Sequence, residues 1–268
     1  MGILSLVLSE HSANIEQTIK MAKSDILKTY RGAALGWAWA IIKPVVTIFV
    51  YWFAISIGMR RGGDVNGYPY FLWLISGLVP WFYMNEMLTQ GTESMRKYSF
   101  LITKMNFPVS TIPTFVSISK LIINLILLTV VIIIFCLLGY FPNVYYFQLL
   151  IYLIFSFLFF TFWALFAAPI SCISKDFSNL VKSFVFAIFW FSGVVWNPDT
   201  VKIKPLRVLL KINPITFLVT GFRDALINKK WFFDKPKELF AFLVILAVMG
   251  LFALWSYKRL RKEIPDVL

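Results

Sequence analysis

The sequence predicts an all-α polytopic membrane protein with six transmembrane helices, an N-terminal amphipathic interfacial helix and re-entrant outer helices between spans five and six. Of its 268 residues, 59% are hydrophobic and only 15% are charged, whereas a soluble domain is about 45–50% apolar and about 25% charged. Long uncharged runs recur along the chain, and most charges fall in the short segments between them. This hydropathy argues against a soluble nucleic-acid-binding protein, which the net charge of +13 alone would suggest.

The spans follow from run length, because a transmembrane helix needs about 20 mostly apolar residues. Six stretches qualify, of which the fifth is short: 37–59, 69–88, 112–138, 148–172, 180–196 and 239–257. The segment between the last two is too polar to cross, and Pro198, Pro205 and Pro214 interrupt it, which favours re-entrant or interfacial helices. We expect one membrane domain over residues 35–257, preceded by a cytosolic segment, 1–34, and followed by a basic cytosolic tail, 258–268.

The N-terminal segment has helical periodicity. Ile15, Ile19, Ala22, Ile26 and Tyr30 recur at three- and four-residue spacing, which predicts an amphipathic helix over about 15–30. Such a helix either lies along the inner membrane surface, with its basic residues on anionic headgroups, or packs on its own protein; we favour the first.

The distribution of lysine and arginine predicts that both termini are cytosolic, since positive charge is retained inside. The first thirty residues lack the apolar region of a cleavable signal peptide. The first outer loop holds only Arg60 and Arg61, but the third outer segment is an exception to the rule. It contains nine basic residues: Lys202, Lys204, Arg207, Lys211, Arg223, Lys229, Lys230, Lys235 and Lys237.

Residues for chemistry are scarce. There is no phosphate-binding G-x-x-x-x-G-K-[ST] loop and no metal-binding or nucleophile motif. Within the predicted spans the only acidic residue is Glu86, and we interpret Lys43 and Lys120 as snorkelling from the inner ends of their spans. The chain therefore has neither a motor nor an active site that the sequence reveals, and we expect no bound metal.

A membrane domain without a motor suggests a permease driven by a separate subunit, and four stretches make this specific. TYRGAALGWAWAIIKPVV, at residues 29–46, joins the amphipathic helix to the first span. GLVPWFYMNE in the second span, SKDFSNLVKSF before the fifth and NPITFLVTGFRDAL after it follow in order. Together they resemble the membrane subunits of ABC-2 type exporters for polysaccharides and teichoic acids, most closely those of wall teichoic acid exporters.

The resemblance implies a multi-pass permease of the bacterial cytoplasmic membrane rather than an enzyme. Two copies of such a subunit pair with two ATP-binding subunits, which hold ATP and Mg²⁺, so this chain needs no cofactor of its own. The substrate implied is an undecaprenyl-linked polymer, with membrane lipids as surroundings. We predict teichoic acid export; O-antigen or capsular polysaccharide export is the alternative, and a lipid-modifying membrane enzyme is a more distant one.

The resemblance places the contact with the ATP-binding subunit on two cytosolic segments, residues 15–30 and residues 91–108. An ordinary cytosolic loop is the alternative for the second segment. The SKDFSNL stretch, from Ser174, is either a further small contact with the ATP-binding subunit or a simple turn in which Asp176 caps span five. The coupling residues that we expect are Lys20, Lys23, Lys28, Arg96, Lys97, Tyr98, Phe100 and Asp176.

The resemblance also places spans one and five on the transport path. Aromatic faces stack on sugar rings and can close an empty pore; the alternative for each single ring is that it faces lipid or a neighbouring helix. Arg31 and Trp37 either meet the phosphate of a substrate or belong to a generic interface belt. The path residues that we expect are Arg31, Trp37, Tyr51, Trp52, Phe53, Phe186, Phe189, Trp190 and Trp196.

The basic outer segment predicts an exit surface for a polyanion, which favours a poly(polyol phosphate) over a neutral glycan. Contact with outer headgroups explains the same charges. We assign Lys202, Lys204, Arg207 and Arg223 to this gate, and the NPITFLVTGFRDAL match suggests in addition that Arg223 is structural, holding the re-entrant helices against span five or six.

Overall fold

The computed structural model describes residues 2–32, 34–59, 63–105 and 107–268; Ala33, Arg60 and Arg61 lie outside them. It is helical, and its principal helices are α1 (Ile3–Ala13), α2 (Ile15–Tyr30), α3 (Trp39–Trp52), α4 (Tyr70–Glu86), α5 (Ser94–Lys97), α6 (Ser99–Lys104), α7 (Thr111–Leu137), α8 (Gln148–Ile173), α9 (Lys175–Phe191), α10 (Lys204–Ile212), α11 (Pro214–Arg223), α12 (Pro236–Leu260) and α13 (Ile264–Val267). Shorter turns extend several of them: η1 (Gly36–Ala38), η2 (Phe53–Gly58), η3 (Met87–Gly91), η4 (Val144–Phe147), η5 (Pro198–Thr200), η6 (Asp224–Asn228) and η7 (Phe232–Asp234).

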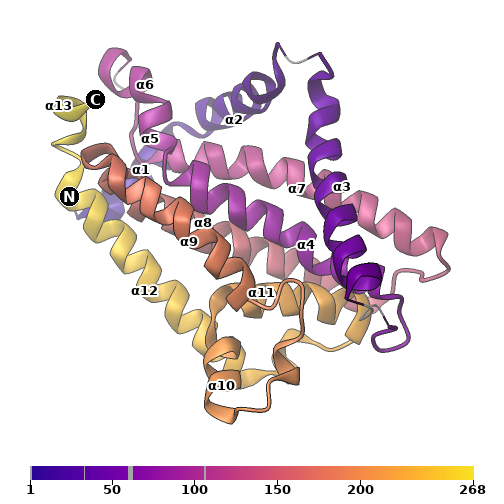
Figure 1. The fold of residues 1–268 in the computed structure, drawn as a ribbon. Helices are drawn as coiled ribbons and strands as arrows, with labels where there is room; N and C mark the ends of the chain where they lie inside the picture. Colours follow the sequence, from indigo (N-terminus) through magenta and orange to yellow (C-terminus); the bar gives the residue numbers. More distant parts are fainter. Residues whose placement is uncertain (1, 33, 60–62, 106) are drawn as a thin grey trace.

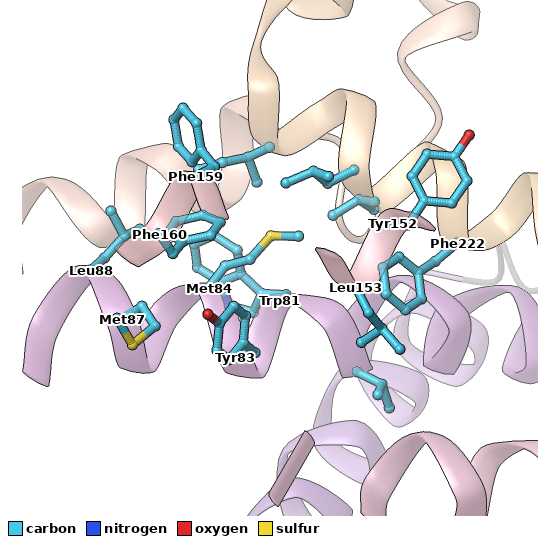
Figure 2. Packing of buried hydrophobic residues seen from close by; sticks show 14 of the residues in the cluster. Trp81, Tyr83, Met84, Met87, Leu88, Tyr152, Leu153, Phe159, Phe160 and Phe222 are labelled. Atoms are coloured by element: carbon cyan, nitrogen blue, oxygen red, sulfur yellow. The ribbon is translucent and has the colours of Figure 1, made fainter. Parts of the chain in front are cut away.

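Helix α4 is the centre of the bundle. Most of its side chains are buried, and it packs against α7 and α11, while α8 packs against α12. Its aromatic and Met side chains meet those of α8 and α11 in one continuous core, where Trp81, Met84, Phe160 and Phe222 are among the residues shown in Figure 2. A helix buried all round is what a uniformly apolar sequence predicts.

Four helical stretches in the described part of the chain are long and apolar enough to cross a membrane: Gly36–Gly58, Thr111–Leu137, Val144–Ile173 and Pro236–Leu260. They correspond to the predicted spans one, three, four and six. The second and fifth predicted spans correspond to α4 and α9, which have 17 residues each. The chain is thus a helical membrane-embedded protein, and the count of six spans stays a prediction.

Span five was predicted at 180–196, but α9 covers Lys175–Phe191 and ends earlier. The chain turns at Gly193, whose φ of +61° favours glycine. A Cβ there would also lie 2.5 Å from Pro198. The early end has a structural role, because it frees backbone carbonyls that a distant arginine uses.

The segment between α9 and α12 forms two short helices, α10 and α11. Pro205 lies in the first turn of α10, and Pro214 is the first residue of α11. Proline suits this position because its missing N–H has no partner in a first turn. Asn213 caps α11 by accepting a hydrogen bond from the Ile215 backbone N–H at 2.9 Å. The predicted interruptions are therefore helix starts.

The predicted amphipathic helix is confirmed as α2, which lies across α7 (Figure 1). Ala22 and Ile26 are buried against the protein, whereas Ile15 and Ile19 are exposed. The helix therefore packs on its own chain along part of its length, and an apolar strip at its start stays uncovered. A preceding helix, α1, was not predicted.

Candidate functional site

A cavity of about 510 Å³ opens between α3, α4, α7 and α9. The resemblance placed spans one and five, here α3 and α9, on the transport path, and both contribute to the wall of the cavity. Helices α4 and α7, the end of α2 and Gln90 of η3 line the rest, so residues from the first half of the chain meet those of the fifth predicted span in one cavity.

One wall of the cavity is aromatic. The Phe189 ring lies 5.1 Å from that of Tyr51 and 5.2 Å from that of Trp81, measured between centroids. Phe186 also lines the cavity. These rings come from α3, α4 and α9, so the aromatic wall is a contact between the first span and two helices of the bundle.

The lining also contains charged side chains, Lys43, Glu86, Lys120 and Lys182, from four different helices, beside apolar ones such as Leu127. Lys120 Nζ lies 3.5 Å from Glu86 Oε2, and Lys182 Nζ lies 2.7 Å from Glu93 Oε1. A cavity that combines aromatic faces with paired charges can accept a ligand that is part sugar or lipid and part anion.

The interpretation of Lys120 as a snorkelling residue is wrong. Its side chain is 3% exposed, since α2 and α4 close over it, and it pairs with carboxylates instead of reaching the interface. A buried ammonium requires such partners because desolvating it is costly.

The second of these carboxylates is Asp25 of α2, which is fully buried. Its Oδ1 accepts hydrogen bonds from Lys97 Nζ at 2.8 Å and from the Tyr98 hydroxyl. Its Oδ2 accepts one from the Ser119 hydroxyl and lies 4.0 Å from Lys120 Nζ. One aspartate thus ties α2 to the segment of residues 91–108 and to α7.

Burial by itself would raise the pKa of Asp25, but the charges of Lys120 and Lys97 and the hydrogen bonds to the carboxylate outweigh it and lower the pKa below its usual value. Burial, followed by the hydrogen bond and the charge of Asp25, raises the pKa of Tyr98. Asp25 is therefore ionised at neutral pH, with Tyr98 as a neutral donor.

The predicted coupling residues divide into two groups. Arg96 and Lys97 are engaged within the fold, and Tyr98 is buried; the Arg96 guanidinium donates to Ser171 Oγ at 3.1 Å and contacts the Ser171 carbonyl. Lys20, Lys23 and Lys28 are exposed on α2.

At the surface of the 91–108 segment, Phe100 of α6 is 39% exposed, with the ammonium of Lys28 5.3 Å from its ring centroid. Asp176 is exposed in the first turn of α9, where Ser174 is the N-cap and forms no side-chain capping bond. The alternative in which Asp176 caps this helix is wrong, because Asp176 lies inside the first turn and Ser174 is the N-cap; its role in coupling stays a prediction.

The predicted path residues also divide. Tyr51, Phe186 and Phe189 line the cavity, and the Trp190 ring contacts that of Phe189 at 5.7 Å. The other predicted path residues do not line the cavity. Trp52 packs edge-on against Phe71, Phe53 stacks on Phe49, and Trp37 contacts Tyr30, while Arg31 is exposed. Trp196 lies in the turn after α9, where its indole N–H donates to the Trp190 carbonyl at 2.7 Å.

Among the predicted gate residues, Lys202 and Lys204 are exposed and Arg207 is half-buried, all within or just before α10. Arg223 differs, because its side chain is buried. The assignment of Arg223 to an exit surface is therefore wrong. The second interpretation, that Arg223 has a structural role, agrees with its hydrogen bonds to three backbone carbonyls.

The guanidinium of Arg223 donates to the Gly193 carbonyl at 2.7 Å, to the Trp73 carbonyl at 3.3 Å and to the Val194 carbonyl. Its central carbon lies 3.5 Å from the centroid of the Trp73 ring. Arg223 thus fastens α11 to the unwound end of α9, and also to α4, which the sequence did not predict.

The sequence did not reveal Asp25, Trp81 or the role of Lys120. The sequence did contain a signal for the role of Lys120. Glu86 is the only acidic residue of the predicted spans, and of Lys43 and Lys120 the latter is nearer to it along the chain. Asp25 gave no such signal, because it appears as one polar residue of an amphipathic helix. Within the described ranges, no group of three or more histidine, cysteine or acidic side chains is placed to hold a metal ion.

The fold is that of a helical membrane-embedded protein with a cavity between its helices, and a buried cluster of charges around Asp25 ties α2 to α7 and to the 91–108 segment. The sequence model of the ABC-2 type transporter family matches residues 16–227. The chain belongs to this family, whose members normally pair with an ABC ATP-binding subunit. It is a permease and not an enzyme, and the ATPase is a separate subunit.

Curated relatives agree with this membership. An O-antigen export system permease protein RfbA of Myxococcus xanthus is 22% identical over 241 residues, which cover 89% of this chain and 88% of the relative. A protein of the same name from Klebsiella pneumoniae is 21% identical over 234 residues, covering 87% and 88%. A second Klebsiella pneumoniae protein of this name has the same identity and coverage.

Proposed function

We propose that the chain is the membrane subunit of an ATP-driven exporter that moves a lipid-linked polysaccharide across the bacterial cytoplasmic membrane. The observation that carries the proposal is the cavity between α3 and α9, with Tyr51, Trp81 and Phe189 on one wall and charged side chains beside them. Aromatic faces suit sugar rings, and the charged lining suits the phosphate of a lipid carrier.

The working unit in this proposal is two copies of the chain with two ATP-binding subunits. In it, α2 and the 91–108 segment receive the movement of the ATP-binding subunit, and the exposed Phe100 is part of that contact. Both termini lie in the cytosol, the chain crosses the membrane six times, and α10 and α11 are at the outer side. Each copy supplies one lateral cavity through which the lipid-linked end enters the path.

The relatives bear names of O-antigen export permeases, which favours a polysaccharide as the polymer. A poly(polyol phosphate) of the teichoic acid type is the second candidate, and the exposed Lys202 and Lys204 favour it. The other charges of this segment support it less, because Lys211 pairs with Asp199 at 2.5 Å and Arg223 is buried. We therefore place the polysaccharide first.

The test is reconstitution of the permease with its ATP-binding subunit in liposomes, followed by ATPase and translocation assays with lipid-linked polymers. We expect ATP-dependent movement of lipid-linked polysaccharide and stimulation of the ATPase by it. A response to poly(polyol phosphate) alone would favour the second candidate. If no ATP-binding subunit assembles with the chain, the exporter proposal is wrong.

A further inference from the structure

Two segments that we expect at the ATP-binding subunit converge on one buried carboxylate. Lys97 and Tyr98, from the 91–108 segment, both donate to Asp25 of α2. Asp25 has no exposed surface, so its charge depends on these partners, on Ser119 and on Lys120. Any movement of the 91–108 segment relative to α2 therefore changes the balance of charge around Asp25.

Lys120 lies between this carboxylate and the cavity. Its ammonium nitrogen is 4.0 Å from Asp25 Oδ2 and 3.5 Å from Glu86 Oε2. Both separations exceed the roughly 2.7–2.9 Å of a direct charge-assisted hydrogen bond. A small shift of the Lys120 ammonium towards one carboxylate or the other therefore decides which of the two it neutralises. Glu86 and Lys120 both line the cavity.

The two carboxylates differ in what happens to them without the lysine. The side chain of Glu86 is 42% exposed, whereas that of Asp25 is 0% exposed. Water can solvate Glu86 but not Asp25, and a buried unpaired charge is the costlier of the two. When Asp25 loses a donor, Lys120 is therefore drawn towards it and away from Glu86.

Resting on the proposed function, we propose that Lys120 is a shared cation through which the 91–108 segment sets the charge of the transport cavity. Withdrawal of Lys97 and Tyr98 from Asp25 draws Lys120 to Asp25 and leaves Glu86 as an unpaired anion on the cavity wall. Their return releases Lys120 towards Glu86 and neutralises the wall. Asp25, Lys97 and Lys120 are positioning residues in this device, and no bond is made or broken.

The experiment uses the complex of the full chain with its ATP-binding subunit in lipid nanodiscs. Cys136 and Cys172 are replaced by alanine, and Thr47→Cys, in the cavity lining, reports the state of the cavity through its rate of reaction with a small maleimide. We expect a non-hydrolysable ATP analogue to change this rate by at least about twofold, the lower range of coupling carried by residue networks.

In Asp25→Asn we expect the response to the nucleotide to be lost while the complex still assembles. Lys97→Met, at the exposed end of the contact, weakens the response in the same way and serves if Asp25→Asn does not assemble. In the Lys120→Met background, Asp25→Asn has no further effect, because the cation that links the two carboxylates is gone. Glu263→Gln removes an exposed carboxylate after α12, outside the two coupling segments, and keeps the full response.

A full response in both Asp25→Asn and Lys97→Met overturns the inference and leaves the proposed function intact. An effect of Asp25→Asn that persists without Lys120 also overturns it, because the coupling then bypasses the shared cation. If the unsubstituted complex shows no response to nucleotide, the proposed function fails, and the inference fails with it.

Discussion

Arg223 is held more tightly than any other of the predicted site residues. Three backbone carbonyls accept from its guanidinium, and the Trp73 ring covers one face of it. A planar fork with several donors suits this arrangement, whereas a single ammonium cannot reach diverging carbonyls together. Its contribution is therefore to the stability of the junction between α11, α4 and the end of α9.

We expect Arg223→Met to lower the free energy of unfolding by roughly 2–4 kcal/mol, since it leaves buried carbonyls without donors. Arg223→Lys should recover only part of this. Thermal unfolding in detergent measures the effect. Arg207→Met, on the half-buried arginine of α10, is the control and should change the melting temperature little; equal losses in both variants would contradict the structural role.

Asp25 predicts a dependence of stability on pH. Its pKa is lowered in the folded protein, so its contribution is present above the unfolded value of about 3.9 and is lost as the pH falls through the folded pKa. Unfolding curves between pH 7 and pH 3 should show acid destabilisation of the unsubstituted protein. Asp25→Asn should be less stable at pH 7 and should lose less on acidification; parallel curves would contradict this.

Among the elements, some helix ends could be predicted from the sequence and others could not. The bounds of α2 follow from its periodicity, because one face is apolar and packs on α7. The early end of α9 could not be predicted, because residues 192–196 read as a continuation of an apolar span. The turn there exists to present the Gly193 and Val194 carbonyls to Arg223, which lies 30 and 29 residues further along the chain.

The same limit applies to the candidate site. The aromatic wall could be predicted in part, since Tyr51, Phe186 and Phe189 stand on the two spans that the motifs indicated. The charged part could not, because the partners of Asp25 lie 72 to 95 residues away from it. Periodicity reports which face of a helix is buried, but not which polar residue on that face meets a partner.

Helix α6 carries a prediction about docking. Phe100 is exposed at its start, while the neighbouring Tyr98 and Leu101 are buried. We expect Phe100→Ala to weaken binding of the ATP-binding subunit by about 1–2 kcal/mol, the range of an exposed aromatic contact that becomes buried in an interface. Titration by surface plasmon resonance on nanodisc-held permease measures this.

Phe233→Ala removes an exposed phenylalanine of η7, between α11 and α12, and should leave that affinity unchanged. An unchanged affinity in Phe100→Ala as well would place the docking surface elsewhere.

Helices α8 and α11 approach closely at Gly221. A Cβ at this position would lie 2.1 Å from the Tyr152 ring, so the side chain of α8 occupies the space that any larger residue needs. Gly221→Ala should destabilise the protein by about 1–3 kcal/mol through overpacking, measured by thermal unfolding. Gly250→Ala is the control, because a Cβ at Gly250 would lie 3.3 Å from Phe162; it should lower the free energy of unfolding less than Gly221→Ala does.

In the whole molecule, the two ends of the chain lie together (Figure 1). Glu10 of α1 accepts from the Ser110 hydroxyl at the start of α7 and from the Tyr257 hydroxyl near the end of α12, the latter at 3.2 Å. Helix α1 thus joins the first and last parts of the bundle. Such a contact requires an even number of crossings between α2 and the end of α12, as six spans supply.

We expect both ends to face the cytosol, because the contacts of Glu10 bring them to one side and the distribution of lysine and arginine predicts that this side is the cytosolic one. In a background with Cys136 and Cys172 replaced by alanine, an impermeant maleimide applied to intact cells should label Lys237→Cys and not Ser12→Cys or Lys262→Cys. Labelling of all three after permeabilisation is the control for reactivity. Labelling of either terminal cysteine in intact cells would contradict the orientation.

The first span is the least buried of the four long apolar helices, which bears on how the chain is made. None of the most apolar stretch of Gly36–Gly58 is buried, whereas α4 is mostly buried and packs against α7 and α11. The first span can therefore settle in the bilayer as soon as it leaves the ribosome. The packing of α4 is completed later, because the Arg223 guanidinium, which lies on the Trp73 ring and reaches the Trp73 carbonyl, is synthesised 150 residues after it. We therefore expect a chain interrupted before Arg223 to leave the core around α4 incomplete and to be degraded more readily than the full chain.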